Sequence, residues 1–450
     1  MSEPSCLLRA LPDVKAPRLL PALALVAVIG LAFPGRAAST VQHDRVKESG
    51  TAVCHGEGEP AVTVTSAGRW VGYNDVSVCG EVGFVQGARL AGLQLLPARG
   101  GAHRLIALPP LEAGWSYIGD PALAADADGA GVVFTSLTGV SQPQVSGGLI
   151  SSGTLRLVAV HVSGSGRATR LPAISEGTFD DKESVAVDTV TGSPRRGWVY
   201  VAWDDVVTSQ TVLRAWDGRR WQPRRVVDDR ASFPDVSVGP GGVLAVAEEV
   251  AGGISVVTSR DGGKTFGKPV QALVGYAPGT TNASCTQPIK TIGVRQRDIA
   301  SPRLAWDAAG RLHVVAALGT GLVSAFATSS SGVVEGVSRD QGRTWTSRLV
   351  ASNGWAASVA SVGSGVAIGY LQLADAAGTT YVAKVDRGGT STVVSAAPAR
   401  FPVGFLVAQC YGIGDYTGTG ARAGLVTFAW GSTEGTTPDD TDVQVATLSR

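Results

Sequence analysis

The same short hairpin sequence occurs twice in this chain, at residues 259–266 and again at residues 338–345. An Asp at the head of a tight turn accepts hydrogen bonds from the backbone N–H groups that follow, Gly supplies a positive φ, and an aromatic ring closes over the hairpin. The repeat therefore predicts a structural β-hairpin that is used more than once. Its matching residues are Ser259, Asp261, Gly263, Thr265 and Phe266 in the first copy and Ser338, Asp340, Gly342, Thr344 and Trp345 in the second.

Composition favours an all-β protein. The 450 residues include 59 Gly, 23 Pro and a single Met, and only 17% are charged. A turn-rich, weakly charged chain of this kind is typical of a β fold and not of a helical or disordered one. The 38 Lys plus Arg residues nearly balance the 37 Asp plus Glu residues, so we expect no nucleic-acid partner.

The first 38 residues have the layout of a secretory signal peptide. Basic residues lead into the apolar run Leu19–Phe33, and small residues follow it up to Ala38. The run of about 15 residues is shorter than the ~20 that a spanning helix needs. We expect residues 1–38 to be removed on export, which leaves residues 39–450 as a secreted, extracellular domain with no membrane segment. An uncleaved anchor is the alternative.

Export changes the interpretation of the cysteines. Cys6 would leave with the signal peptide, and the even set Cys54, Cys79, Cys285 and Cys410 remains, which fits two disulfides. Cys54 with Cys79 is the local pair, and Cys285 with Cys410 would then form a long-range bond. Free, buried thiols are the alternative.

A unit of roughly sixty residues recurs along the chain, with an inner strand, a Gly-containing turn and a second apolar strand in each copy. We expect a single β-propeller of four-stranded blades, with seven blades favoured and six plus an appended hairpin as the second choice. The last unit lacks a fourth strand, which residues 41–53 could supply by closing the ring. The seven units begin near Glu59, Asp120, Lys182, Phe233, Ser301, Ala357 and Gly414.

In such a ring, the loops that lead into the inner strands and the loops that leave the second strands share one face, which we call the mouth. This geometry gathers many acidic residues at the mouth, although the chain as a whole is neutral. Crowded carboxylates are stable only if some are protonated, paired with cations or bound to a metal. We expect no required cofactor and name Ca²⁺ as the cation that such a ring could hold.

The residues at the mouth divide into two groups of candidates. A turn-capping role is the alternative for any single acid among them. The candidate catalytic residues are Asp181, Glu183, Asp204 and Asp415. The candidate ligand-binding residues are Asp120, Lys182, Asp235, Arg303, Tyr411 and Tyr416.

The two octapeptides resemble the Asp-box of the bacterial neuraminidase repeat, found in the sialidase-like superfamily of secreted β-propellers. The resemblance implies that the boxes are structural and lie far from the active site. It also implies an arginine triad, a Tyr nucleophile with a Glu partner, and an Asp acid/base. Where the family has Arg-Ile-Pro, this chain reads Gly58-Glu59-Pro60, and Arg303 is the one remnant of a triad. An acid there would repel a substrate carboxylate, so exo-sialidase activity is not expected.

These observations predict a monomeric propeller whose acidic mouth binds a glycan, or a ligand held with the help of a cation. A glycoside hydrolase of the sialidase superfamily is the first alternative, and it requires two carboxylates about 5 to 9.5 Å apart, one with a raised pKa. A scaffold for protein interactions, which needs no chemistry at the mouth, is the second.

Overall fold

The computed structural model describes residues 40–46, 57–75, 91–98, 101–140, 144–146, 149–151, 155–175, 179–275, 301–319, 331–375, 380–400, 406–407, 410–411, 414–433 and 441–449. All of them belong to the compact unit Ser39–Arg450. Among these residues, no helix is both long enough and apolar enough to span a membrane. The proposed signal peptide, Cys54, Cys79, Cys285 and the side chains of Cys410 and Tyr411 lie outside this description.

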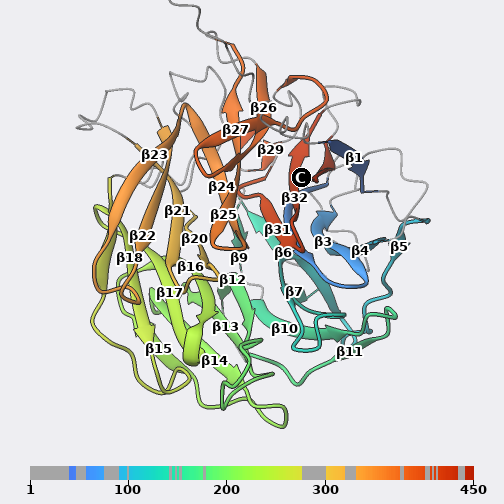
Figure 1. Cartoon of the computed structure of the whole chain (residues 1–450). Coiled ribbons are helices and arrows are strands. Elements are labelled where there is room, and N and C mark those ends of the chain that lie inside the picture. The colour runs from blue at the N-terminus through green and yellow to red at the C-terminus, as the bar shows by residue number, and fades with distance from the viewer. Residues whose placement is uncertain are drawn as a thin grey trace, which may run out of the picture. The chain divides into compact units, whose positions relative to one another are not determined.

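The described strands form seven four-stranded antiparallel sheets, which are the blades of a β-propeller (Figure 1). The expected fold class is thereby confirmed, with seven blades. Blade 1 holds β2 (Glu57–Val64), β3 (Gly68–Asp75), β4 (Ala91–Pro97) and β5 (Arg104–Leu105). Blade 2 holds β6 (Trp115–Ala125), β7 (Val132–Val140), β10 (Leu155–Val162) and β11 (Ala168–Arg170). Blade 3 holds β12 (Asp180–Val187), β13 (Val199–Asp205), β14 (Gln210–Trp216) and β15 (Arg225–Asp228).

The remaining blades follow in chain order. Blade 4 holds β16 (Ser232–Gly239), β17 (Val243–Val250), β18 (Gly253–Ser259) and β19 (Val270–Val274), with a 3₁₀ turn at Pro240–Gly242. Blade 5 holds β20 (Arg303–Trp306), β21 (Leu312–Gly319), β22 (Ser331–Ser338) and β23 (Thr346–Ser352). Blade 6 holds β24 (Gly354–Val362), β25 (Gly365–Leu373), β26 (Thr380–Arg387) and β27 (Thr390–Val393). Blade 7 holds β31 (Gly418–Arg422), β32 (Leu425–Ser432), β33 (Asp442–Leu448) and β1 (Val41–Arg45).

Among the described residues, the structure has two short hairpins and one short strand in addition to the four strands of each blade. The hairpin β8 (Gln144–Ser146) and β9 (Leu149–Ser151) is inserted between β7 and β10, and β28 (Ala399–Arg400) pairs with β26. A second hairpin, β29 (Leu406–Val407) and β30 (Cys410–Tyr411), precedes blade 7.

The ring closes at blade 7, where the N-terminal strand β1 pairs with β33 near the C-terminus, and Val41 lies opposite Leu448. Residues 41–45 therefore supply the missing fourth strand, as the sequence predicted. Each inner strand also contacts the next one around the ring, in the order β2, β6, β12, β16, β20, β24, β31 and back to β2.

The core consists of hydrophobic clusters that lie between neighbouring blades, so each sheet is buried on both faces. This explains why the second strands, such as Leu312–Gly319, are apolar almost throughout and do not alternate. Close packing between blades needs small residues at some points. At Gly239 a Cβ atom would lie 2.2 Å from Trp306 Cδ2 of the next blade, so only glycine fits there.

The two Asp-box hairpins have the predicted internal bonds. Asp261 Oδ1 accepts hydrogen bonds from the backbone N–H groups of Lys264 and Thr265, both at 3.0 Å. Gly262 and Gly263 both have φ near 81°. In the second copy Asp340 makes the equivalent bonds at 3.1 and 2.9 Å. Because these hairpins join the third and fourth strands of blades 4 and 5, they lie at the end of each blade remote from the mouth.

Candidate functional site

The inner strands reach the mouth through β-bulges that have unusual backbone geometry. β2, β6, β12, β16 and β24 each carry a register shift near their first residues. A bulge redirects a side chain, and a non-glycine residue at positive φ costs on the order of 1–3 kcal/mol. This backbone strain recurs at corresponding positions of several blades. We infer that the direction of the side chains at the mouth is important. The residues at positive φ are Glu59 (50°), Asp120 (51°), Lys182 (53°), Phe233 (51°) and Ala356 (48°).

Glu59 and Asn74 connect three blades at the mouth. Asn74 Nδ2 donates to Glu59 Oε2 at 2.6 Å, and Asn74 Oδ1 accepts the backbone N–H of Asp120 at 2.9 Å. Glu59 Oε1 accepts the backbone N–H of Asp415 at 3.0 Å. Burial, followed by the negative charges of Asp120 and Asp415, raises the pKa of Glu59 well above its ordinary value. Where the sialidase resemblance implies an arginine, the mouth thus holds a carboxyl group that favours its protonated form.

Two cations approach Tyr416, which comes just before β31. Lys182 Nζ lies 3.1 Å from the centre of the Tyr416 ring, and the Arg303 guanidinium carbon lies 5.2 Å from it. Lys182 and Tyr416 are both buried, with 6% and 4% of their surfaces exposed. Burial, and then the charge of Arg303, lowers the pKa of Lys182 to about 8. Positive charge from blades 3 and 5 is therefore gathered around an aromatic ring of blade 7.

Asp235 connects blades 3, 4 and 5. It accepts hydrogen bonds from the Ser184 hydroxyl at 2.7 Å and from the Leu304 backbone N–H at 2.6 Å, and Arg303 Nη1 lies 3.3 Å from its Oδ1. Both oxygens of this candidate ligand-binding residue are thus engaged within the protein. Asp235 orients Arg303, and this contact makes it a positioning residue.

Asp181 and Asp120 form a pair of carboxyl groups. Burial, followed by the charge of Asp120 and the hydrogen bond that protonated Asp181 donates to the Asp120 carboxylate, raises the pKa of Asp181 to about 7. Asp181 also lies directly opposite Asp204 in the ladder between β12 and β13. Burial raises the pKa of Asp204 to about 8, even though its carboxylate accepts the Phe233 backbone N–H at 2.8 Å.

Glu183 is a buried acid with few contacts. Only 4% of its surface is exposed, and among the described residues only its own backbone N–H donates a hydrogen bond to its carboxyl oxygens. Burial, and then the charge of Asp120, raises its pKa well above the ordinary value. A buried polar group without partners costs about 1–3 kcal/mol, so the fold tolerates Glu183 at the expense of stability.

The mouth is less negative than its residue types suggest. Burial raises the pKa of Glu59, Asp181, Glu183 and Asp204. The pKa reaches about 7 for Asp181 and about 8 for Asp204, so these two acids hold protons near neutral pH. Lys182 and Arg303 supply positive charge in the same place. Within the described residues, no group of three or more His, Cys, Asp or Glu side chains has the arrangement of a metal site. The mouth offers hydrogen-bond donors and acceptors together, because a protonated carboxyl group donates as well as accepts.

The structure brings nearly all the candidate residues to one place. Asp120, Asp181, Lys182, Glu183, Asp235, Arg303, Asp415 and Tyr416 are linked by the bonds and charge interactions above, and Asp204 joins them through Asp181. For Tyr411 the described backbone gives only its strand, β30. The sequence analysis did not identify Asn74. Its position at the end of a second strand, next to Asp75, would have indicated it.

Comparison with solved structures finds matches at low sequence identity. A Hadza microbial sialidase, Hz136, matches with 14% identity over 73% of this chain and 65% of that chain, with a TM-score of 0.48. A protein of unknown function from Dyadobacter fermentans matches with 11% identity over 91% of this chain and 99% of that chain, with a TM-score of 0.49. Trypanosoma rangeli sialidase matches with 12% identity over 92% of this chain and 60% of that chain, with a TM-score of 0.48.

These likenesses concern the fold alone. The chain spans less than two thirds of the length of both sialidases. No model of a known protein family matches the sequence, and no curated protein matches it.

Proposed function

We propose that the mouth of this propeller binds a glycan in the extracellular space, after residues 1–38 have been removed. The observation that carries the proposal is Glu183, a buried carboxyl group for whose oxygens the described part of the chain offers no donor other than its own backbone N–H. A ligand hydroxyl would satisfy this group. Binding sites typically place a few polar groups of this kind where they fix a ligand's orientation.

The chemistry of the mouth supports a polar, largely neutral ligand. Asp181 and Asp204 hold protons near neutral pH, so they can donate to and accept from hydroxyl groups, which are the groups that sugars display. The strained bulges at Glu59, Asp120 and Lys182 direct charged residues towards the same place. In this proposal the protein is a monomer and needs no cofactor, and Ca²⁺ is the cation to test beside the glycan.

The experiment is a glycan-array screen followed by calorimetric titration of the best ligand. Glu183→Leu keeps much of the side chain's volume but can neither donate nor accept a hydrogen bond, so we expect at least a tenfold weaker affinity, about 1.4 kcal/mol. Asp217→Ala, on a hairpin at the opposite end of blade 3, is the control and should bind like the wild type. No glycan hit, or equal binding by Glu183→Leu, would overturn the proposal and leave protein interaction as the remaining function.

Calcium is tested separately by thermal melting with CaCl₂ and with EDTA. A cation bound only to the folded state raises Tm. Superimposable melting curves would remove Ca²⁺ from the proposal without affecting the glycan.

Glycoside hydrolysis is the second candidate, and the pairing of Asp181 with Asp204 favours it. The two acids lie opposite each other, with pKa values of about 7 and about 8. One ionised and one protonated carboxyl group is the combination that acid–base cleavage of a glycosidic bond uses. Fluorogenic neutral glycosides and sialosides test this candidate, with Asp181→Asn and Asp204→Asn as variants. We expect no turnover of sialosides, because Glu59 stands where the first arginine would be.

A further inference from the structure

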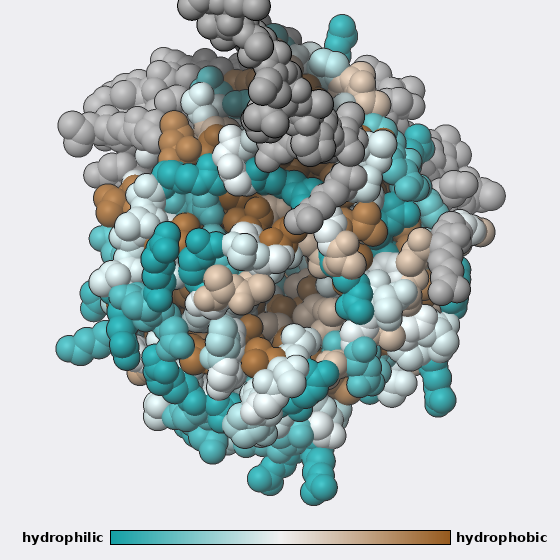
Figure 2. Space-filling view, in the orientation of Figure 1, coloured by the Kyte–Doolittle hydropathy of each residue, from teal (hydrophilic) through white to brown (hydrophobic). Residues whose placement is uncertain are grey.

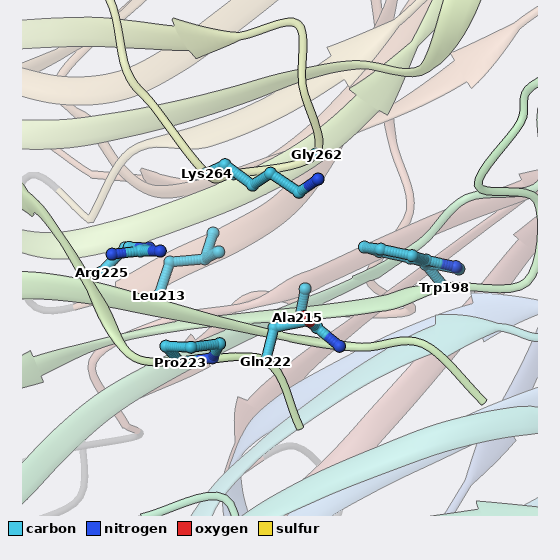
Figure 3. A pocket seen from close by; sticks show the side chains of 9 residues that line it. Trp198, Leu213, Ala215, Gln222, Pro223, Arg225, Gly262 and Lys264 are labelled. Carbon is cyan, nitrogen blue, oxygen red and sulfur yellow. The ribbon is translucent and has the colours of Figure 1, made fainter. Parts of the chain in front are cut away.

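A cavity lies between blades 3 and 4, away from the mouth. Its volume is about 210 Å³, and it opens between β14 of blade 3 and the Asp-box hairpin of blade 4. Leu213 and Ala215 of β14 supply apolar walls, and Trp198 flanks them. Figure 3 shows the Trp198 indole on one side of the space and Arg225 on the other, with Lys264 above and Ala215 below.

Two cationic side chains, Arg225 and Lys264, line this cavity. Arg225 and Lys264 are both exposed, and neither forms an ion pair with a described residue. The Lys264 backbone N–H is held by Asp261, so the hairpin fixes where this side chain starts. Hydrophilic residues also gather along the lower edge of Figure 2, over the strands of blades 3 and 4.

A third cation holds the hairpin in place. Arg195 Nη2 donates to the backbone carbonyl of Arg260 at 2.8 Å. The Arg195 side chain crosses directly over Gly262, where a Cβ atom would lie 2.5 Å from Arg195 Cδ. The Asp-box hairpin, which carries Lys264, is thus fixed to blade 3 by Arg195. This contact requires glycine at position 262.

From this arrangement we propose a second binding site, which takes a small ring compound that bears a carboxylate. The indole and the walls of β14 accept the flat apolar face of a ring, and Arg225 and Lys264 bind the carboxylate by charge-assisted hydrogen bonds. The volume suits a single ring. An acidic sugar residue and an aromatic acid share this chemistry. The site lies at the end of blade 4 remote from the mouth and is independent of the glycan site proposed there.

The test is calorimetric titration of the full chain with glucuronate, glucose and benzoate. We expect glucuronate or benzoate to bind and neutral glucose to bind at least about tenfold more weakly, because it lacks the carboxylate. Arg225→Gln, Lys264→Gln and Trp198→Ala should each weaken binding of the acid by at least about fivefold. Arg343→Gln is a matched control, since Arg343 holds in the second Asp-box the place of Lys264 in the first.

Comparison of glucuronate with benzoate identifies the class of ligand. Preference for glucuronate assigns the site to acidic sugars, and preference for benzoate assigns it to aromatic acids. Binding that Arg225→Gln and Lys264→Gln leave unchanged, or no binding of either acid, would overturn the proposal. Glu183→Leu at the mouth should leave this binding unchanged, so failure at one site is distinguishable from failure at the other.

Discussion

The ammonium group of Lys182 in blade 3 lies 3.1 Å from the centre of the Tyr416 ring in blade 7. A buried cation on an aromatic face contributes about 2 kcal/mol when both are removed from water. The contact therefore joins two blades that are not neighbours in the ring, and it does so at the mouth.

Lys182 makes stability depend on pH in a particular window. Its folded pKa, about 8, lies below its unfolded value of 10.5, so between these values the unfolded chain binds more protons. The contribution of Lys182 to the free energy of unfolding therefore rises with pH from about 8 upwards. We expect the wild type to gain about 2 kcal/mol relative to Lys182→Met between pH 8 and pH 9.5. Urea denaturation at both pH values measures this, and a constant difference would contradict it.

We expect Glu183 to lower the stability of the folded protein while it contributes to glycan binding. Its folded pKa is raised, so above the unfolded pKa the folded protein retains a proton that the unfolded chain has lost, and stability falls as pH rises. Glu183→Leu should increase the free energy of unfolding by about 1–3 kcal/mol at pH 7 and by less at pH 5. The same variant should lose glycan binding. A destabilised variant would show that Glu183 has a bonding partner in solution.

Most of the fold could be predicted from the sequence because its repeats are local. The Asp-box hairpins and the second strands follow from patterns within one unit, and the ring closure by residues 41–45 follows from the missing fourth strand of the last unit. The character of the mouth could not be predicted in the same way. That Asp235 holds Arg303, and that Asn74 holds Glu59, depends on contacts between blades that no single unit encodes. Composition suggested an acidic mouth, whereas burial keeps several of these acids protonated.

The Asp-box aspartates should stabilise the fold without taking part in binding at the mouth. The Thr265 hydroxyl and two backbone N–H groups donate to Asp261, and such bonds outweigh burial and lower its pKa to about 2. Asp261→Ala should reduce the free energy of unfolding by about 1–3 kcal/mol at pH 7, with glycan affinity unchanged. Asp340→Ala should have a similar effect. Chemical denaturation measures both, and a change in glycan affinity would contradict the assignment.

His313 is held between two acids in blade 5. Its Nδ1 lies 2.8 Å from Glu335 Oε1, and its Nε2 lies 3.2 Å from Asp307 Oδ2. Burial alone would raise the pKa of Glu335, but the bonds from His313 and Arg348 hold it below the ordinary value. Because the pKa of Glu335 is lower in the folded protein than in the unfolded chain, its carboxylate stabilises the folded protein above the unfolded pKa. This contribution to the free energy of unfolding is lost as pH falls through the folded pKa.

Glu335→Gln should therefore cost about 1–3 kcal/mol at pH 7 and progressively less as pH falls below 4.5. Thermal melts between pH 3 and pH 7 test this. His161, which lies half-exposed 3.4 Å from Asp126, offers a control pair: Asp126→Asn should cost less than Glu335→Gln. Equal losses at every pH would contradict the role given to Glu335.

The pairing of β1 with β33 brings the two ends of the propeller within one backbone hydrogen bond, from the Ser449 N–H to the Thr40 carbonyl, at 3.2 Å. The ring is therefore closed by a contact between its two ends, and among the described residues this contact has the longest sequence separation. Folding can complete only when both ends are present, since forming such a contact carries a large loop-closure entropy. A circular permutant that joins Ser449 to Thr40 by a short linker would make this contact local, and it should fold faster while the mouth stays intact.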